Sequence, residues 1–207
     1  MKQTSVLMFD LGGVLVDTAS LETLTSLLGG ATSAGARDGT RDDQAVRDRW
    51  LRSPAVRSFE SGRIAPEVFA QRFVEEWGVS MEPAAFLEDL SSWIRRPYEG
   101  AAELITRLRE AHHVSCFSNC NELHWAKLAA FVAGFDSAFS SHLLGQIKPD
   151  EQAFRAVLRE LGVGPEAVRF FDDSRANVEA AERLGIRAFL VDGLDGTRRA
   201  LMDEGLL

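Results

Sequence analysis

Short apolar runs recur along the chain and predict buried β-strands. The first, residues 5–9, stops at Asp10 and a pair of glycines. A short continuous apolar run that ends at glycines is typical of a strand buried on both faces, as in a parallel sheet. Similar runs occupy residues 114–117, 168–171 and 187–191. We therefore expect a sheet whose strands are separated by long stretches of sequence.

Apolar positions at helical spacing fill the stretches between these runs. They predict helices at residues 101–111, 122–131, 151–161 and 174–184. Strands that alternate with helices of this length indicate βαβ units, whose crossovers are right-handed. The predicted fold class is α/β, with a Rossmann-like, mostly parallel sheet core.

The segment between about residue 18 and residue 96 breaks the alternation. It contains no convincing strand, and its pattern predicts helices at residues 21–28, 42–51, 66–77 and 83–94. Glycine-rich residues 29–39 and the turn at residues 60–63 separate them. We predict that this segment is an inserted α-helical cap domain, residues 19–96, and that residues 1–18 and 97–207 form the core.

Composition limits the partners. The chain has 31 acidic and 23 basic residues, a net charge of −8, and an acidic surface repels nucleic acid and anionic membranes. No apolar run approaches the roughly 20 residues of a membrane span, and Asp10 interrupts the only stretch that could resemble a signal peptide. We expect a cytoplasmic protein, monomer or homodimer, with a small-molecule partner.

The two cysteines are too few for a disulfide framework. Cys116 and Cys120 lie four positions apart, and a zinc site would need further cysteines or clustered histidines. We expect reduced thiols, and the sequence leaves any redox role open.

Polar residues follow the predicted strands, where ligands of open α/β sheets bind. Taken singly they are weak signals, because acidic residues also cap helices and a lysine is usually a solvated surface residue. Together they place three carboxylates, a hydroxyl and an ammonium at one edge of the sheet. These groups belong to Asp10, Ser118, Lys148, Asp172 and Asp173, and Asn119 lies next to Ser118.

Four segments, in order, resemble the motifs of the haloacid dehalogenase-like superfamily, most of whose members are phosphatases. Residues 9–17, Phe-Asp-Leu-Gly-Gly-Val-Leu-Val-Asp, look like the first motif, and Ser118-Asn119 is similar to the second. Lys148-Pro149 resembles the third, and residues 171–174 with Asn177 resemble the fourth. The Asp-Leu-Gly-Gly-Val-Leu form, with residues 59–64 in the cap, looks like a branch that contains sugar-phosphate phosphatases.

The resemblance implies covalent catalysis assisted by a metal. Asp10 would attack phosphorus and form an aspartyl-phosphate that water then hydrolyses. A carboxylate that attacks a phosphate dianion meets like-charge repulsion, so a cation such as Mg²⁺, which prefers oxygen ligands, is required. Asp10, Asp173 and the Gly12 carbonyl would hold the metal, and Asp172 would ligate it directly or through water.

The remaining motif residues would bind phosphate. Lys148 would neutralise its charge and keep Asp10 ionised. Ser118 and the backbone N–H of Asn119 would bind phosphate oxygens, with the loop at Gly12 and Gly13 assisting. The implied function is a Mg²⁺-dependent phosphomonoester hydrolase acting on a small phosphorylated metabolite, including sugar phosphates such as a sugar 1-phosphate.

Gly12 departs from the pattern, because most phosphatases of this superfamily carry a second Asp there. That carboxylate protonates the leaving oxygen, which is worth roughly 10²–10⁴-fold in rate. One hypothesis is a preference for good leaving groups, as in sugar 1-phosphates or aryl phosphates, and another is that Asp17 takes over the role. A 2-haloacid dehalogenase, or a catalytically weak binding or regulatory protein with this fold, remain alternatives.

Overall fold

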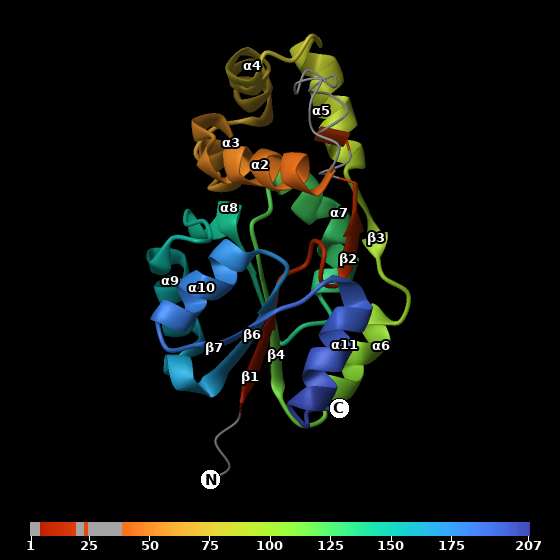
Figure 1. Ribbon diagram of the computed structural model, residues 1–207, viewed down its shortest axis with the longest axis vertical. Helices are drawn as coiled ribbons and strands as arrows, with labels where there is room; N and C mark the ends of the chain where they lie inside the picture. Colours follow the sequence, from red (N-terminus) through yellow and green to blue (C-terminus); the bar gives the residue numbers. More distant parts are fainter. Residues whose placement is uncertain (1–4, 20–22, 25–38) are drawn as a thin grey trace.

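A computed structural model describes residues 5–19, 23–24 and 39–207. Its centre is a five-stranded parallel sheet with strand order β5-β4-β1-β6-β7 (Figure 1). The α/β class and the four predicted strands are thereby confirmed. The strands are β1 (Val6–Phe9), β4 (His113–Ser118), β5 (Ser137–Ser140), β6 (Val168–Asp172) and β7 (Arg187–Leu190).

The sequence pattern did not predict β5. Its four residues, Ser-Ala-Phe-Ser, contain a single large apolar side chain and are mostly only half-buried or exposed. The strand lies at the edge of the sheet and exists because it pairs with β4 along its length. Its conformation is therefore set by a neighbouring strand, and not by its own hydrophobic pattern.

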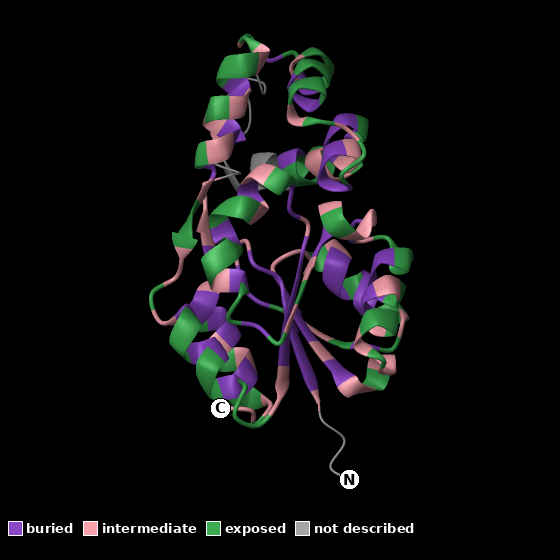
Figure 2. Cartoon of the chain, turned by 180° about the vertical axis from the view of Figure 1, so that it is seen from behind, coloured by how far each residue is buried: buried purple, intermediate pink, exposed green. Residues whose placement is uncertain are grey.

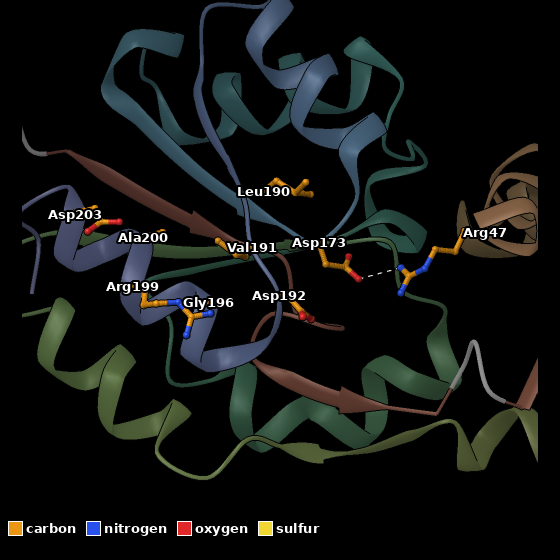
Figure 3. Close-up of a pocket in the computed structure, with 9 residues that line it drawn as sticks. All are labelled: Arg47, Asp173, Leu190, Val191, Asp192, Gly196, Arg199, Ala200 and Asp203. Atoms are coloured by element: carbon orange, nitrogen blue, oxygen red, sulfur yellow. Dashed lines mark hydrogen bonds and ion pairs between the residues drawn. The ribbon is translucent and has the colours of Figure 1, made fainter. Parts of the chain in front are cut away.

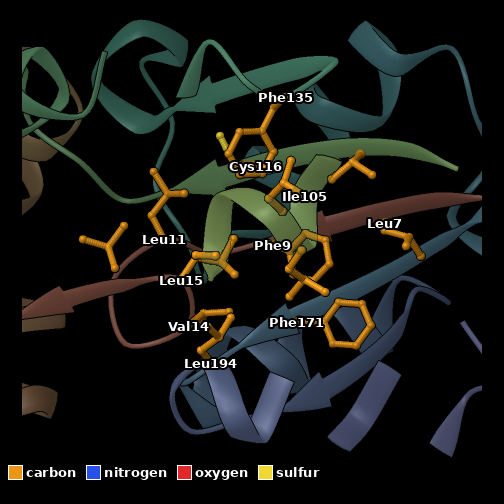
Figure 4. Packing of buried hydrophobic residues seen from close by; sticks show 14 of the residues in the cluster. Leu7, Phe9, Leu11, Val14, Leu15, Ile105, Cys116, Phe135, Phe171 and Leu194 are labelled. Atoms are coloured by element: carbon orange, nitrogen blue, oxygen red, sulfur yellow. The ribbon is translucent and has the colours of Figure 1, made fainter. Parts of the chain in front are cut away.

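Strand β1 is the middle strand, and all four of its residues are buried. Leu7 and Phe9 point to one face of the sheet, and Val6 and Met8 point to the other. On the first face, the rings of Phe9 and Phe171 stack with centroids 4.8 Å apart, in a cluster shown in Figure 4. Burial on both faces explains why the run before Asp10 is continuously apolar.

Helices cover both faces of this sheet. The helices α6 (Ala101–Leu108), α7 (Glu122–Val132) and α11 (Gly193–Asp203) pack on the face of Phe9. The helices α9 (Glu151–Leu161) and α10 (Arg175–Arg183) pack on the other face, and buried residues line the sheet between the two layers (Figure 2). Two short elements, α8 (Ser141–Leu144) and the 3₁₀ turn η1 (Pro165–Ala167), complete the core.

Helix α11 was not predicted, because its first turns contain Gly193 and Gly196, and glycine disfavours helices. It forms because Leu194 and Leu201 pack against the sheet. Across the described ranges, no helix is both long enough and apolar enough to cross a bilayer.

A helical insertion lies between β2 (Val16–Thr18) and β3 (Ile94–Pro97). The helices predicted at residues 42–51, 66–77 and 83–94 correspond to α2, α4 and α5. The predicted helix at residues 21–28 and the glycine-rich segment 29–39 lie outside the described residues, apart from 23, 24 and 39. The described helices of the insertion are α2 (Gly39–Arg52), α3 (Pro54–Glu60), α4 (Pro66–Trp77) and α5 (Pro83–Ser92).

The prediction that this segment contains no strand was wrong where it returns to the core. Strands β2 and β3 pair antiparallel, with Val16 opposite Pro97 and Asp17 opposite Arg96. Each strand has only three or four residues, too few for an alternating pattern to be visible in the sequence. The ribbon forms because the chain leaves and re-enters the core at neighbouring points.

The insertion has its own aromatic core, separate from the clusters on the sheet. Phe73 lies at its centre, with its ring 4.6 Å from that of Phe86 and 4.9 Å from that of Trp77. Phe69 and Trp50 also contact Phe73. Because these rings come from α2, α4 and α5, they hold the helices of the insertion together.

Replacing Phe73 with alanine should therefore destabilise the protein. We expect Phe73→Ala to lower the free energy of unfolding by about 3–5 kcal/mol, the usual cost of removing a buried aromatic ring. Urea denaturation measures it. The control Val68→Ala, on the exposed side of the same helix, should change it by less than about 0.5 kcal/mol. Equal effects of the two substitutions on the free energy of unfolding would contradict the central place of Phe73 in this aromatic core.

Candidate active site

Three strands deliver polar side chains to one edge of the sheet. Asp10 follows β1, Ser118 ends β4 and Asp172 ends β6, and parallel neighbours end at the same edge. Asp10, Asp172 and Asp173 each bring a carboxylate oxygen to within 4.8 Å of the other two. The structure thus gathers the predicted acidic residues into one cluster.

Lys148 lies between two members of this cluster, Asp10 and Asp172, and its side chain is completely buried. Its Nζ donates hydrogen bonds to the Phe117 carbonyl at 2.8 Å and to Asp172 Oδ2 at 2.7 Å. It also lies 3.3 Å from Asp10 Oδ1. Burial by itself would lower the pKa of Lys148, but the charges of Asp10 and Asp172 outweigh that effect and raise it. Lys148 is therefore a buried cation and not a solvated surface residue.

Asn119 fixes the backbone of Lys148. Its side-chain Nδ2 donates to the Lys148 carbonyl, and its Oδ1 accepts the Lys148 N–H, both at 2.9 Å. The loop after β4 is thus tied to the segment that carries the buried ammonium. The Asn119 side chain is therefore engaged with Lys148. The neighbouring Ser118 is buried.

Asp172 is surrounded by hydrogen-bond donors. Its Oδ1 accepts from the Ser174 N–H at 2.8 Å and from Asn177 Nδ2 at 3.0 Å, and its Oδ2 accepts from Asn177 and Lys148. Burial raises the pKa of Asp172, and the charge of Lys148 opposes that rise. Because every one of these contacts donates to the carboxyl group, they favour its ionised form.

Asp173 is more accessible, and it contacts the insertion. Its Oδ2 accepts a hydrogen bond at 3.1 Å from Arg47, an exposed side chain of α2. Burial raises the pKa of Asp173, as does the charge of Asp10, while Arg47 lowers it. A Cβ at Gly13, whose φ is +70°, would lie 2.5 Å from Asp173 Oδ2. Glycine at position 13 therefore leaves room for this carboxylate.

The loop after β1 is held tightly. Asp10 Oδ1 accepts the Leu11 N–H at 2.7 Å, and the Gly13 N–H donates to the Val16 carbonyl at 3.0 Å. The amide of Gly13 is thus engaged within the loop. Asp17 lies on β2, 3.5 Å from Arg95 of the paired strand, so its carboxylate is directed to that arginine.

An open pocket of about 540 Å³ adjoins the cluster at Asp173 (Figure 3). Arg47 of the insertion and Arg199 of α11 also line it, together with Asp192 and Asp203. One side of the acidic cluster therefore faces a space lined by charges of both signs, two arginines and three aspartates.

Glu60, whose sequence context is only a cap motif and a turn, is buried near Asp10 and Lys148. Its Oε1 accepts from Trp50 Nε1 at 3.2 Å, and its buried Oε2 has no hydrogen-bond partner among the described residues. Burial raises the pKa of Glu60 to about 7, although the hydrogen bond from Trp50 lowers it. Asp10 adds to the rise, and Lys148 and Arg57 oppose it. No sequence pattern marks a glutamate at a helix end as buried.

The two cysteines are free and buried. Burial raises the pKa of Cys116 to about 12 and that of Cys120 well above its usual range. Both side chains are therefore protonated thiols with little nucleophilic character at neutral pH.

Comparison with known families and structures adds four similarities. A family model described as haloacid dehalogenase-like hydrolase matches residues 4–185. A D-ribitol-5-phosphate phosphatase from Bacteroides thetaiotaomicron is 24% identical over 197 residues, which cover 88% of this chain and 89% of that protein.

Solved structures share the fold. A HAD-like family hydrolase from Porphyromonas gingivalis superposes with a TM-score of 0.74 at 22% identity, covering 98% of each chain. A HAD family enzyme from Bacteroides thetaiotaomicron, crystallised with magnesium and inorganic phosphate, gives a TM-score of 0.68 at 22% identity. It covers 91% of this chain and 94% of its own. At these identities the likeness shows the fold.

The buried carboxyl of Glu60 predicts a pH-dependent stability. An unfolded glutamate ionises near its ordinary pKa of 4.5, whereas the folded one ionises near 7. As the pH rises from 4.5 to about 7, the wild type therefore loses folding stability, because ionisation is easier in the unfolded chain. A Glu60→Gln variant has no such group and keeps its stability over this range. The loss reaches about 3 kcal/mol, since one pKa unit corresponds to about 1.4 kcal/mol.

Urea denaturation of wild type and Glu60→Gln at pH 4 and pH 8 measures this difference. We expect the variant to gain stability relative to the wild type as the pH rises. The exposed Glu67 of the same insertion supplies the control Glu67→Gln, which should show no such trend. A pH-independent difference for Glu60→Gln would contradict the burial of an acidic carboxyl there.

Proposed function

Because the chain belongs to the haloacid dehalogenase-like hydrolase family, we propose that it is a Mg²⁺-dependent phosphomonoester hydrolase that works through an aspartyl-phosphate. The observation that carries this proposal is the cluster of Asp10, Asp172 and Asp173, in which Asp10 and Asp172 contact the buried ammonium of Lys148. Three clustered carboxylates and one lysine suit a site that takes up a divalent cation and a phosphate dianion.

The donor set fits Mg²⁺, which prefers carboxylate and carbonyl oxygens. We assign Asp10, Asp173 and the Gly12 carbonyl as its ligands. Asp172 would take part through water, because its two oxygens already accept hydrogen bonds from Ser174, Asn177 and Lys148. The metal, when bound, would neutralise charge on the phosphate.

Asp10 is the proposed nucleophile. The Leu11 N–H and Lys148 both contact its Oδ1, so the carboxylate is held in one orientation before substrate arrives. Such preorganisation lowers the cost of reaching the transition state, because phosphoryl transfer depends mainly on positioning and charge neutralisation. Lys148 cannot swing away, because Asn119 fixes its backbone and its side chain is completely buried.

The phosphate-binding groups follow from the same geometry. We propose that Ser118, the Asn119 N–H and the Lys148 ammonium bind phosphate oxygens, with the Gly12 amide assisting. Gly13 contributes differently: its own N–H bonds Val16, and its missing side chain makes space for Asp173.

For the substrate, we propose a small sugar or polyol phosphate. The similarity to a ribitol-phosphate phosphatase over most of both chains supports this class. Residues 19–96 would act as the cap over the site, since Arg47 of α2 reaches Asp173. A cytoplasmic location and a monomeric or homodimeric state remain predictions from the sequence.

Release of inorganic phosphate tests this proposal. We expect the wild type with Mg²⁺ to hydrolyse p-nitrophenyl phosphate and members of a sugar- and polyol-phosphate panel. EDTA should abolish the activity, and added Mg²⁺ should restore it. Asp10→Asn should lower kcat by roughly 10³-fold or more, because it removes the attacking carboxylate.

Asp195→Asn is the matched control, because this aspartate is exposed on α11 and the substitution should leave the activity unchanged. Activity that survives both EDTA and Asp10→Asn would refute the mechanism. Release of chloride from 2-haloacids without metal would instead favour a dehalogenase. A folded wild type that is inactive on every substrate would favour a binding or regulatory role.

A further inference from the structure

Hydrolysis of an alkyl phosphate requires a proton for the leaving oxygen, and the residues assigned so far do not supply it. Asp10 attacks phosphorus, and Asp172 accepts hydrogen bonds at both oxygens. Asp173 is a proposed metal ligand, and Asp17 lies against Arg95. Gly12 has no side chain to offer. Another acid must therefore come from elsewhere in the fold.

The end of α3 is connected through Ser141 to the loop after β4. Ser141 Oγ donates to the Glu60 carbonyl at 2.5 Å and accepts the Cys120 N–H at 3.0 Å. Glu60 is thus two hydrogen bonds away from the residue that follows Asn119. Helix α3 lies against α8 at this point (Figure 1), and the turn at Gly62 packs so closely on the His142 carbonyl that a Cβ would collide with it.

The Glu60 carboxyl has the properties of a general acid that is protonated before substrate binds. One oxygen is fixed by Trp50, and the other, Oε2, is buried with no partner within the described part of the chain. An unpaired carboxyl oxygen in such a place is costly unless the group is protonated or meets a ligand. The ionisable groups whose charges act on it are Asp10, Lys148 and Arg57, and Cys120 lies near enough to respond to its charge.

We propose that Glu60 is the proton donor to the leaving oxygen, supplied by the helical insertion in place of a carboxylate at position 12. This inference rests on the proposed phosphatase function. It assigns the acid to a different part of the fold, so that proton transfer depends on the insertion being docked on the core.

The chemistry balances over two steps. In the first, Asp10 forms a bond to phosphorus, the bond from phosphorus to the ester oxygen breaks, and that oxygen takes the Glu60 proton and leaves as an alcohol. In the second, water attacks phosphorus and gives one proton to the Glu60 carboxylate. Asp10 leaves as a free carboxylate, hydrogen phosphate is released, and Glu60 is again protonated.

The burial of Glu60 tunes it for this role. A pKa raised to about 7 leaves a substantial fraction protonated at neutral pH, which is where a general acid works best. The proposal therefore predicts that kcat/KM for an alkyl phosphate falls as the pH rises above about 7.

Two substrates separate a proton donor from a merely structural residue. An alkyl phosphate from the panel needs its leaving oxygen protonated, whereas p-nitrophenolate leaves without help. For Glu60→Gln we expect kcat/KM to fall by roughly 10²–10⁴-fold with the alkyl ester and by less than about threefold with p-nitrophenyl phosphate. The parameter kcat/KM is used because it covers only the steps up to release of the alcohol.

The pH profile gives a second measurement. With the alkyl ester, the decline of the wild type above about pH 7 should be absent from Glu60→Gln, whose residual activity no longer depends on that proton. The control Glu67→Gln makes the same chemical change on an exposed part of the insertion, and it should behave like the wild type with both esters.

Four results would overturn the assignment of Glu60. They are an equal loss with both esters, no loss with either, an unchanged pH profile in Glu60→Gln, and a wild type that hydrolyses the aryl ester but no alkyl ester. A wild type that hydrolyses neither ester is a different outcome, because it refutes the proposed function itself. The two failures are thus distinguishable.

Discussion

The arrangement of the whole site depends on one buried cation. Lys148 lies completely inside the protein, between the carboxylates of Asp10 and Asp172 and against the carbonyl of Phe117. Without its charge, the carboxylates at the ends of β1 and β6 would repel each other in a region of low dielectric constant. The ammonium therefore allows two central strands of the sheet to end in acidic residues at the same place.

The rest of the core serves to hold this ion pair network in position. Burial of β1 on both faces fixes the position of Asp10 at the end of this strand. The Phe9–Phe171 stack aligns β1 with β6. Asn119 then ties the loop after β4 to the backbone of Lys148. Hydrophobic packing thus makes the strands rigid, and a few polar contacts fix the positions of the charged groups at their ends.

The insertion brings side chains of both charges to the site. Arg47 meets Asp173 at the exposed side of the cluster, and Arg57 pairs with Asp150 at the start of α9. Glu60 lies near enough to Asp10 and Lys148 for their charges to act on its carboxyl group, and Ser141 holds its backbone. Since these contacts come from α2 and α3, any motion of the insertion would alter the charge around the carboxylates. The aromatic core around Phe73 keeps the two helices in a fixed relation.

The sequence by itself determined the α/β class, four strands of the sheet, four of the helices that cover it and the polar residues at the strand ends, because buried parallel strands and amphipathic helices have distinct periods. It did not reveal β5, the β2–β3 ribbon or α11, whose conformations depend on neighbours far away in the chain. It also could not show that Lys148 and Glu60 are buried. Tertiary structure alone decided that, because the environment of an ionisable group is made by segments that meet only in the folded protein.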